Sequence, residues 1–225
     1  NVVNGSQDYT QVISVEQYAV DLIGSQAADL LIYQNGSVYD GQGGQDTFVA
    51  NLQNSTAAVT VENKTGSSFT FNGATVSNVE RLVLTTGSGA DVISNQYDNV
   101  SDHIQTGQGN DRISLTGAAG GDTVFAGDGN DQIVAEGSAS YLNSGSGDDQ
   151  IEIRGTSAKN TSIDGGAGKD SLRMKLDVRS ATNAINYYIY RYDGNYNNSF
   201  NAYSDGYSLS AITNMADAYT MYHGN

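Results

Sequence analysis

The 225-residue sequence contains no cysteine, no proline and no tryptophan. The lack of cysteine excludes disulfide bonds and thiolate metal sites. Basic residues are scarce as well, because 10 Lys and Arg stand against 25 Asp and Glu, a formal net charge of −15. Nucleic-acid phosphates and anionic lipids would repel such a chain, so we expect neither as a partner. No apolar run approaches the roughly 18 residues of a membrane helix, so we expect no membrane insertion.

Hydrophobic residues make up only 38% of the chain, whereas 27 residues are glycine. This composition is compatible with a disordered acidic chain, or with carboxylates that are arranged for cations. The positions of the acids decide between the two interpretations. The chain starts at Asn1, without methionine or a recognisable signal peptide. We therefore expect a piece of a longer parent chain that carries adjacent domains.

A short motif recurs along the chain: glycines, then an aspartate, one free position and an aliphatic or aromatic residue. Regular copies occur at 86–94, 106–114, 126–134, 144–152 and 165–173, and a less regular one at 41–49. Weaker copies lie midway between the regular ones, with Asp102 and Asp122 in the first two and Ser140 and Thr161 in the next two. The unit is therefore about nine residues, and two units make one coil of about twenty.

Each motif predicts a glycine turn followed by a short strand with alternating outward and inward side chains. One coil is too thin to bury a core by itself, so the coils must stack. The sequence therefore predicts an all-β fold, a parallel β-solenoid with two inner sheets. The expected inner residues of one sheet are Ile93, Ile113, Ile133, Ile151 and Leu172, and those of the other are Ile104, Val124, Leu142 and Ile163.

The aspartates stand two residues before the inward positions, so they line the coil edges in rows. Carboxylates stacked at the ~5 Å strand spacing repel each other by roughly 3 kcal/mol per pair at an effective dielectric of about 20. The sequence has no matching row of Lys or Arg that could neutralise these carboxylates. A divalent cation between coils converts this repulsion into ligation, and calcium is favoured over zinc because thiolates and a histidine row are lacking. The alternative is an ordinary β-helix whose Gly-Asp turns hold no ion.

These segments resemble the RTX (hemolysin-type) nonapeptide repeat, Gly-Gly-x-Gly-x-Asp-x-aliphatic-x, which residues 165–173 (GGAGKDSLR) match at every defined position. The resemblance implies a right-handed parallel β-roll that holds several Ca²⁺ ions between its coils. It implies aspartate ligands at Asp46, Asp91, Asp102, Asp111, Asp122, Asp131, Asp149 and Asp170. It implies carbonyl ligands in the glycine turns at Gly87, Gly89, Gly107, Gly109, Gly127, Gly129, Gly145, Gly147, Gly166 and Gly168. Ser140 and Thr161 depart from the pattern, so the second edge is expected to lose its calcium after a site or two.

We expect a leading strand with a short first roll (1–50), a β-rich insert (51–80), the main roll (81–173) and a Tyr-rich β segment (174–225), possible parts of one elongated domain. Nine of the 15 tyrosines lie in the last segment. Two roles stay open for it. It is a cap over the open end of the core, or a binding face for peptide or sugar. The candidate ligand-binding residues are Tyr188, Tyr190, Tyr192, Tyr196 and Tyr203.

The sequence lacks the motifs of serine hydrolases, zinc proteases, P-loop enzymes and dinucleotide-binding enzymes, so we do not expect an enzyme. The first functional hypothesis is a module of a secreted bacterial adhesin at the cell surface. It would fold on extracellular calcium and bind a peptide or glycan. The second is a non-binding, calcium-triggered folding and secretion element of an RTX toxin or exported enzyme. The third is a subunit of a surface lattice.

Overall fold

The computed structural model describes residues 21–34, 36–97, 99–117, 121–137, 140–155 and 161–176, together with short segments at 203–204, 207–208, 211–213 and 220–221. Every regular element in these residues is a β-strand. Among them, no helix has the length and apolar character that crossing a membrane requires. An all-β fold was expected from the repeat, and the described residues confirm it.

The strands are β1 (Leu22–Ile23), β2 (Leu30–Ile32), β3 (Val38–Asp40), β4 (Thr47–Asn51), β5 (Thr60–Asn63), β6 (Ser68–Phe71), β7 (Ala74–Ser77), β8 (Arg81–Thr85), β9 (Val92–Asn95), β10 (His103–Gln108), β11 (Arg112–Leu115), β12 (Thr123–Asp128), β13 (Gln132–Glu136), β14 (Tyr141–Ser146), β15 (Gln150–Gly155), β16 (Ser162–Asp164), β17 (Ser171–Leu176), β18 (Tyr203–Ser204), β19 (Tyr207–Ser208), β20 (Ala211–Thr213) and β21 (Thr220–Met221).

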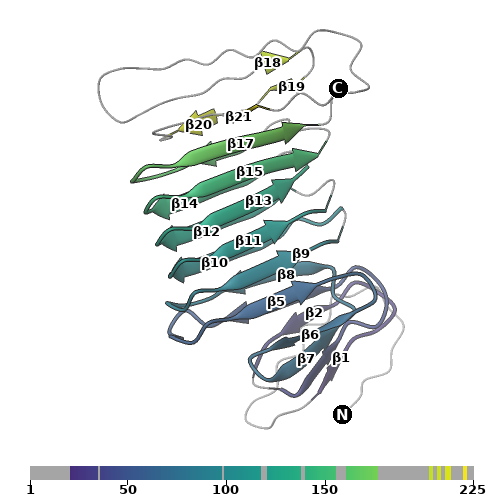
Figure 1. The fold of residues 1–225 in the computed structure, drawn as a ribbon. Coiled ribbons are helices and arrows are strands. Elements are labelled where there is room, and N and C mark those ends of the chain that lie inside the picture. Colours follow the sequence, from purple (N-terminus) through teal and green to yellow (C-terminus); the bar gives the residue numbers. More distant parts are fainter. Residues whose placement is uncertain are drawn as a thin grey trace.

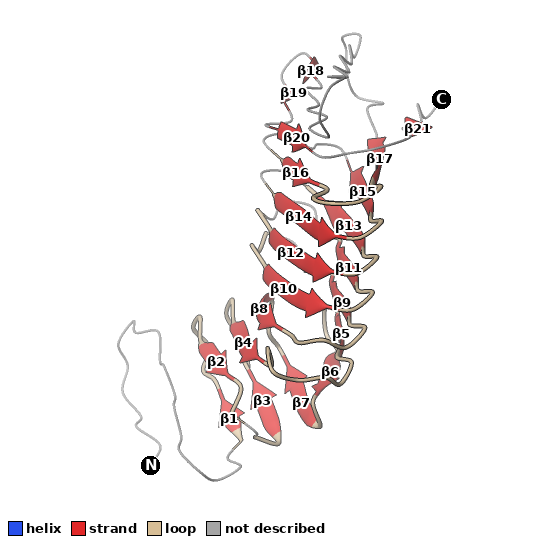
Figure 2. Cartoon of the chain, turned by 90° about the vertical axis from the view of Figure 1, so that its left-hand side faces the viewer, coloured by secondary structure: helices blue, strands red, loops and turns tan. Residues whose placement is uncertain are grey.

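Three sheets build the body of the molecule (Figures 1 and 2). Sheet A has the order β2-β4-β8-β10-β12-β14-β16-β20, sheet C has the order β21-β17-β15-β13-β11-β9-β5, and sheet B has the order β1-β3-β7-β6. From β8 to β17 the chain alternates between sheets A and C, and each strand up to β15 pairs in parallel with the strand two places further along. This connectivity defines a parallel β-solenoid.

The inner side chains stack in the register that the repeat predicts. In sheet C, Ile113 lies opposite Ile93 and Ile133, and in sheet A, Val124 lies opposite Ile104 and Leu142. The predicted inner residues of both sheets are at most 4% exposed. Along the axis of the stack each coil is only one strand thick, so a single coil cannot bury a core. The stacked inner side chains form one continuous core, and the predicted core is confirmed.

The N-terminal coils are built differently from the later ones. Strands β1, β3 and β7 of sheet B alternate along the chain with β2, β4 and β8 of sheet A. Sheet A therefore continues into the later coils, whereas the sheet with which it alternates changes from B to C. Residues 51–80, which we expected to form an insert, hold β5, the first strand of sheet C, and the antiparallel pair β6–β7. These residues therefore join the stack. The expected leading strand lies outside the described residues.

An aromatic cluster fills the wider core of these first coils. Phe48 lies with its ring centroid 5.4 Å from Tyr39 and 5.2 Å from Phe71, and Tyr33 lies 5.0 Å from Phe71. The buried hydroxyl of Tyr39 accepts hydrogen bonds from the backbone N–H groups of Gln34 and Gly36, both at 2.8 Å. The first coils thus gain stability from aromatic packing with edge-to-face geometry.

The Tyr-rich C-terminal segment lies almost entirely outside the described residues. Strands β20 and β21 extend sheets A and C, and β18 pairs with β19 in antiparallel fashion. Tyr188, Tyr190, Tyr192 and Tyr196 fall outside the description, and so does the side chain of Tyr203 in β18. The choice between a cap and a binding face therefore stays a prediction.

The stacked core predicts a large difference between two neighbouring residues of β13. Ile133 is fully buried, whereas Val134 faces outward and is partly exposed. Ile133→Ala should lower the free energy of unfolding by about 2–5 kcal/mol, because it leaves a cavity between coils. Val134→Ala, the matched control, should cost less than about 1 kcal/mol. Urea unfolding of the calcium-loaded protein measures both, and equal losses would contradict the assigned core.

Candidate metal centre

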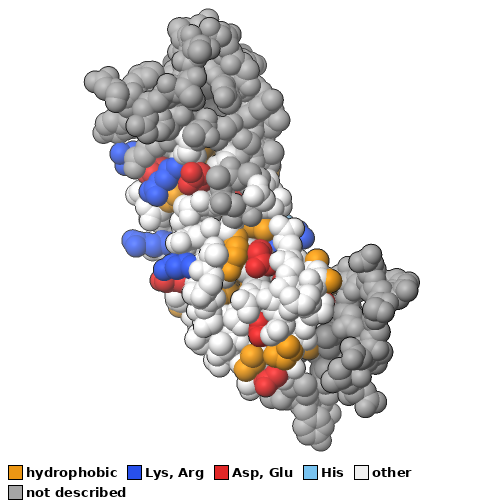
Figure 3. Space-filling view, turned by 90° about the vertical axis from the view of Figure 1, so that its right-hand side faces the viewer, with side chains coloured by type: hydrophobic (Ala, Val, Ile, Leu, Met, Phe, Trp, Pro, Cys, Tyr) orange, Lys and Arg blue, Asp and Glu red, His pale blue; other side chains and the backbone are white. Residues whose placement is uncertain are grey.

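Five aspartates form a row along the first edge of the roll, where the chain turns from sheet A to sheet C. Each directly precedes a strand of sheet C, and each is at most 2% exposed. They are Asp91, Asp111, Asp131, Asp149 and Asp170. On the face seen in Figure 3, acidic side chains appear only as separate spots, although the chain carries a net charge of −15. Five of the chain's 25 Asp and Glu residues are buried in this row.

One carboxylate oxygen of each aspartate accepts a hydrogen bond from the backbone of the preceding coil. The Oδ1 atom of Asp131 accepts a hydrogen bond from the backbone N–H of Asp111 at 2.8 Å, and that of Asp149 accepts one from Asp131 at 2.8 Å. The same bond recurs along the row at 2.7–3.0 Å, from Val59 at one end to Asp170 at the other. A carboxylate that accepts a backbone N–H makes a strong, charge-assisted bond. Oδ1 is thus satisfied inside the protein.

The second carboxylate oxygen has no such partner in most of the row. The Oδ2 atoms of Asp111, Asp131, Asp149 and Asp170 are buried and accept no hydrogen bond among the described residues. At the end of the row, the Oδ2 atom of Asp91 instead accepts a hydrogen bond from the Thr86 hydroxyl. A buried carboxylate oxygen without a partner is costly, so the four free Oδ2 atoms fit a bound cation.

The glycine turns bring carbonyl oxygens to the same edge. A Cβ atom on Gly127 would lie 1.8 Å from the carbonyl oxygen of Gly107, and one on Gly129 would lie 1.6 Å from that of Gly109. Gly127 and Gly129 also have φ angles of 110° and 138°, which other residues rarely adopt. Only glycine therefore permits this stacking, in which carbonyl oxygens and carboxylates share one turn. Ca²⁺ prefers such an all-oxygen donor set.

No group of three or more His, Cys, Asp or Glu side chains converges on one point in the part of the chain that is described. This is the expected result of the row, because each coil contributes one carboxylate at the strand spacing. An ion here would be held by carboxylates of successive coils and by glycine carbonyl oxygens. The described ion pairs join Lys64 to Glu62, and Arg154 and Arg173 to Glu152, so none of them neutralises the row.

A second row stands at the second edge, where the chain enters sheet A. Asp102 and Asp122 belong to it, as expected, and the backbone N–H of Asp102 donates to the Oδ1 atom of Asp122 at 2.9 Å. Ser140 and Thr161 follow in the same positions before β14 and β16. Their hydroxyls bring no charge to these two coils. The structure thus places all four residues at one edge, as the sequence pattern implies.

Asp46 also lies at the second edge, before β4 of sheet A, and not in the row of Asp91. Its neighbours there are Asp29 and Glu80: the backbone N–H of Asp29 donates to the Oδ1 atom of Asp46, and that of Asp46 donates to Glu80, both at 2.7 Å. The Oδ2 atom of Asp46 is buried without a partner. Asp29 and Glu80 were missed because their turns lack the glycine motif. Their position two residues before a buried leucine would have identified them.

Asn95 was also missed, and it changes the surroundings of Asp102. Its side-chain amide donates to both carboxylate oxygens of Asp102, at 3.0 and 2.8 Å, and to the carbonyl oxygen of Glu80 at 2.8 Å. The backbone N–H of Leu82 donates to Asp102 as well. The carboxylate of Asp102 is therefore satisfied by hydrogen bonds on both oxygens, unlike the Oδ2 atoms of the first row.

Burial disfavours the ionised form of the carboxyl groups in both rows. In the first row it raises the pKa of Asp131 to about 7, helped by the charges of Asp111 and Asp149, and that of Asp170 to about 6. In the second row burial raises the pKa of Asp102 to about 7 and that of Asp122 to about 6. Without a cation, the ionised rows therefore destabilise the fold near neutral pH.

These observations define the molecule as a parallel β-roll whose edges present buried carboxylates and carbonyl oxygens to cations. Residues 98–115 and 116–151 match the family model of the RTX calcium-binding nonapeptide repeat, in four copies. This part of the chain therefore consists of RTX repeats, which bind calcium, and the resemblance seen in the sequence is confirmed. No curated protein matches the sequence. Asp91 and Asp170 lie outside the matched residues but make the same hydrogen bonds as the matched aspartates.

The raised pKa values predict how the metal-free protein responds to pH. A carboxyl whose folded pKa lies above its unfolded value contributes stability when it is protonated, and that contribution is lost as pH rises through the folded pKa. In EDTA, lowering the pH from about 8 to about 5 should therefore favour the folded roll and raise its β content, since the pKa of Asp131 is about 7 and that of Asp170 about 6. Circular dichroism of the metal-free protein across this pH range measures the change. A metal-free protein that is less stable at pH 5 would contradict the buried row.

The row also predicts that Asp131→Asn has opposite effects with and without calcium. The amide oxygen of the variant can still accept the hydrogen bond from the N–H of Asp111, but the negative charge of the carboxylate is lost. In EDTA the variant should hold more β structure than the wild type, because repulsion within the row falls. In calcium its affinity should fall by about tenfold or more, since even groups that only orient a ligand matter by that factor. Asp21→Asn, at an exposed position outside the row, is the charge-matched control and should change neither the β content in EDTA nor the calcium affinity strongly.

Proposed function

We propose that this chain is a calcium-folded RTX module of a secreted bacterial adhesin. In this proposal it folds on extracellular Ca²⁺ and then holds a peptide or glycan ligand at the cell surface, without catalysing a reaction. The observation that carries the proposal is the file of buried aspartates whose Oδ2 atoms have no partner. RTX repeats occur in secreted bacterial proteins, which supports export of the parent chain.

The buried rows supply the physical basis for a folding switch. At cytosolic calcium levels the carboxylates would repel each other inside the roll, so the open chain is favoured and remains exportable. Extracellular calcium modules bind with dissociation constants of about 10⁻⁴–10⁻³ M. Calcium outside the cell would then fold the chain, because the ions bind only the folded roll.

The outer face of sheet A supports a binding role after folding. Phe125 is 36% exposed and Tyr141 is 39% exposed, and their ring centroids lie 5.6 Å apart. His103 adds a third ring, 6.1 Å from Phe125. Exposed aromatic rings on a rigid sheet offer contact area at little entropic cost, which suits recognition of another molecule. This surface begins beside the second edge, because His103 directly follows Asp102 and Tyr141 directly follows Ser140.

Circular dichroism tests the folding switch. The chain should show little β structure in EDTA at neutral pH and gain it cooperatively when calcium reaches the millimolar range. Magnesium at the same concentration is the control, because its small octahedral shell suits the carbonyl-rich turns poorly. Identical spectra in EDTA and in calcium would contradict the proposal.

Screening against glycan arrays and peptide libraries, each in calcium and in EDTA, tests the adhesin role. Ligands that bind only in calcium are the expected result. A module that folds on calcium but binds no glycan and no peptide would retain only the folding role.

A further inference from the structure

The turns of the aspartate row differ in one buried residue, which stands five positions before each aspartate. In chain order these residues are Thr86, Thr106, Ala126, Ser144 and Gly165. All five are buried, at the end of the sheet A strands, where the chain turns toward sheet C. Three of them carry a hydroxyl group and two do not. A buried hydroxyl can donate a hydrogen bond to a carboxylate beside it, so the turns do not depend equally on a cation.

Thr86 satisfies the carboxylate of Asp91 without a metal ion. Its hydroxyl donates to the Oδ2 atom of Asp91, the oxygen that has no partner in the other four aspartates of the row. The carbonyl oxygen of Thr106 lies 3.0 Å from the same hydroxyl. A hydroxyl has a single proton to donate, and a charged carboxylate is the stronger of these two acceptors. The hydroxyl of Thr86 thus does for Asp91 what a cation would do.

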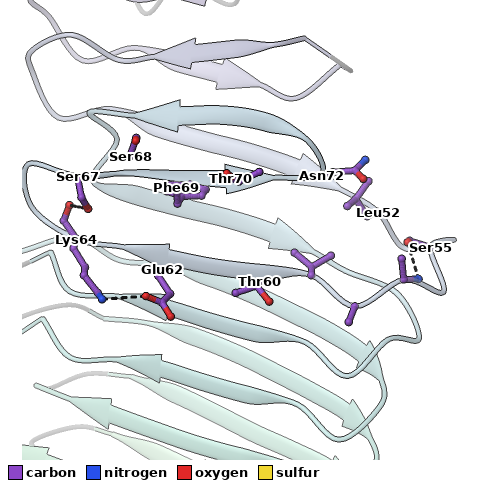
Figure 4. A pocket seen from close by; sticks show the side chains of 13 residues that line it. Leu52, Ser55, Thr60, Glu62, Lys64, Ser67, Ser68, Phe69, Thr70 and Asn72 are labelled. Atoms are coloured by element: carbon purple, nitrogen blue, oxygen red, sulfur yellow. Dashed lines mark hydrogen bonds and ion pairs between the residues drawn. The ribbon is translucent and has the colours of Figure 1, made fainter.

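The turn of Asp91 also has no acidic neighbour in the preceding coil. That coil passes the first edge in residues 52–59, which contain neither Asp nor Glu. The backbone N–H of Ser88 donates to the carbonyl oxygen of Ser55 at 2.8 Å, so the two turns are in direct contact. Leu52 and Ser55 of this loop are labelled in Figure 4, where the chain leads into β5. A cation between these two turns would meet one carboxylate of the row, whereas each later coil boundary of the row offers two.

Thr106 and Ser144 are intermediate cases. The hydroxyl of Thr106 donates to the carbonyl oxygen of Ala126 at 2.8 Å. Burial raises the pKa of Asp111, and the nearby Thr106 hydroxyl opposes this rise. Ser144 stands in the same relation to Asp149. Turning the O–H bond moves the proton from the carbonyl oxygen toward the carboxylate, so these two hydroxyls can partly compensate a missing cation.

Asp131 and Asp170 have no hydroxyl at this position, because Ala126 and Gly165 stand there. No group in the described part of the chain donates a hydrogen bond to their Oδ2 atoms. Burial raises the pKa of Asp131 to about 7 and that of Asp170 to about 6. The protein itself therefore compensates the burial of these two carboxylates least.

We propose that the residue five positions before each aspartate sets how strongly that turn of the roll depends on calcium. A hydroxyl there takes the place of the ion at the carboxylate or competes with it, whereas alanine or glycine leaves the carboxylate dependent on the ion. The order of increasing dependence is Asp91, then Asp111 and Asp149, then Asp131 and Asp170. The hydroxyls act through the carboxylates and are not calcium ligands themselves. This inference rests on the calcium-dependent folding proposed above and does not involve the adhesin role.

Counting the bound ions tests the two ends of this order. Equilibrium dialysis against radioactive calcium at a saturating concentration is carried out with the full chain and with two matched variants. Asp131→Asn should bind at least one ion fewer than the wild type, because its turn has no other compensation. Asp91→Asn should bind as many ions as the wild type, because the Thr86 hydroxyl serves that carboxylate. An Asp91→Asn variant that loses as many ions as Asp131→Asn would overturn the inference.

Moving the hydroxyl tests the residue itself. Thr86→Val removes the hydroxyl and keeps the shape of the side chain, whereas Thr86→Ser keeps the hydroxyl and is the control. Ala126→Ser adds a hydroxyl to the turn of Asp131, at a position where the adjacent coils already hold Thr106 and Ser144. Circular dichroism over a calcium titration gives the midpoint of folding for each variant. Urea unfolding in saturating calcium gives its stability when the ions are bound.

Thr86→Val should raise the calcium midpoint about twofold or more, and Ala126→Ser should lower it by a similar factor, because several bound ions share the effect of one hydrogen bond. Thr86→Ser should keep the wild-type midpoint. In saturating calcium all three variants should unfold at nearly the urea concentration of the wild type, because an ion then serves the carboxylate. A hydroxyl with a purely structural role would be missed equally at every calcium concentration.

Two further results would overturn the inference. The first is a Thr86→Val variant that keeps the wild-type midpoint, or that is as strongly destabilised in saturating calcium as at its midpoint. The second is an Ala126→Ser variant whose calcium midpoint equals or exceeds that of the wild type. The wild-type titration comes before both. A wild-type chain that does not fold on calcium refutes the proposed function itself, so the two failures are distinguishable.

Discussion

The stacking of buried carboxylates at the edge of the roll is the interaction on which the rest of the structure depends. Each aspartate ties two coils together through Oδ1, and the same side chain turns a buried Oδ2 atom toward the edge. The backbone ladders of the sheets set the coil spacing, the Oδ1 hydrogen bonds reinforce it at the edge, and the free oxygens set the requirement for a cation. The core aliphatic residues and the aspartates are therefore stacked at one common spacing.

The two ends of the roll solve the same charge problem in different ways. In the first coils, aromatic packing around Phe48 and the amide of Asn95 contribute stability that needs no metal ion. From Asp111 onward the core residues are smaller, and the carboxylates of the first edge have no such protein partner. Sheet A runs through both parts. Aromatic packing therefore adds stability to the first coils that needs no metal ion, but these coils also contain a buried carboxylate oxygen without a partner, the Oδ2 atom of Asp46.

The sequence predicts the repeating part of the molecule well because contacts there are local and periodic. The position of Ile133 follows from that of Asp131 two residues earlier, and the same rule places every later coil. The change from sheet B to sheet C could not be predicted, since it depends on which strand β5 and β7 meet in space. In the candidate site, too, only the periodic residues could be predicted. Its regular aspartates were identified, whereas Asp29 and Glu80 lie in turns without the glycine signal and Asn95 lies at the end of strand β9.

The single-strand thickness of the coils has a mechanical consequence. The first coils lie at one end of the stack, and strands β20 and β21 lie at the other, next to β16 and β17 (Figure 1). Tension between these ends acts across the hydrogen bonds of one coil boundary after another. Each coil of about twenty residues that peels away lengthens the chain by about 70 Å. Calcium bound between neighbouring coils would resist each of these steps, so the force needed to unravel the roll would depend on the calcium concentration around it.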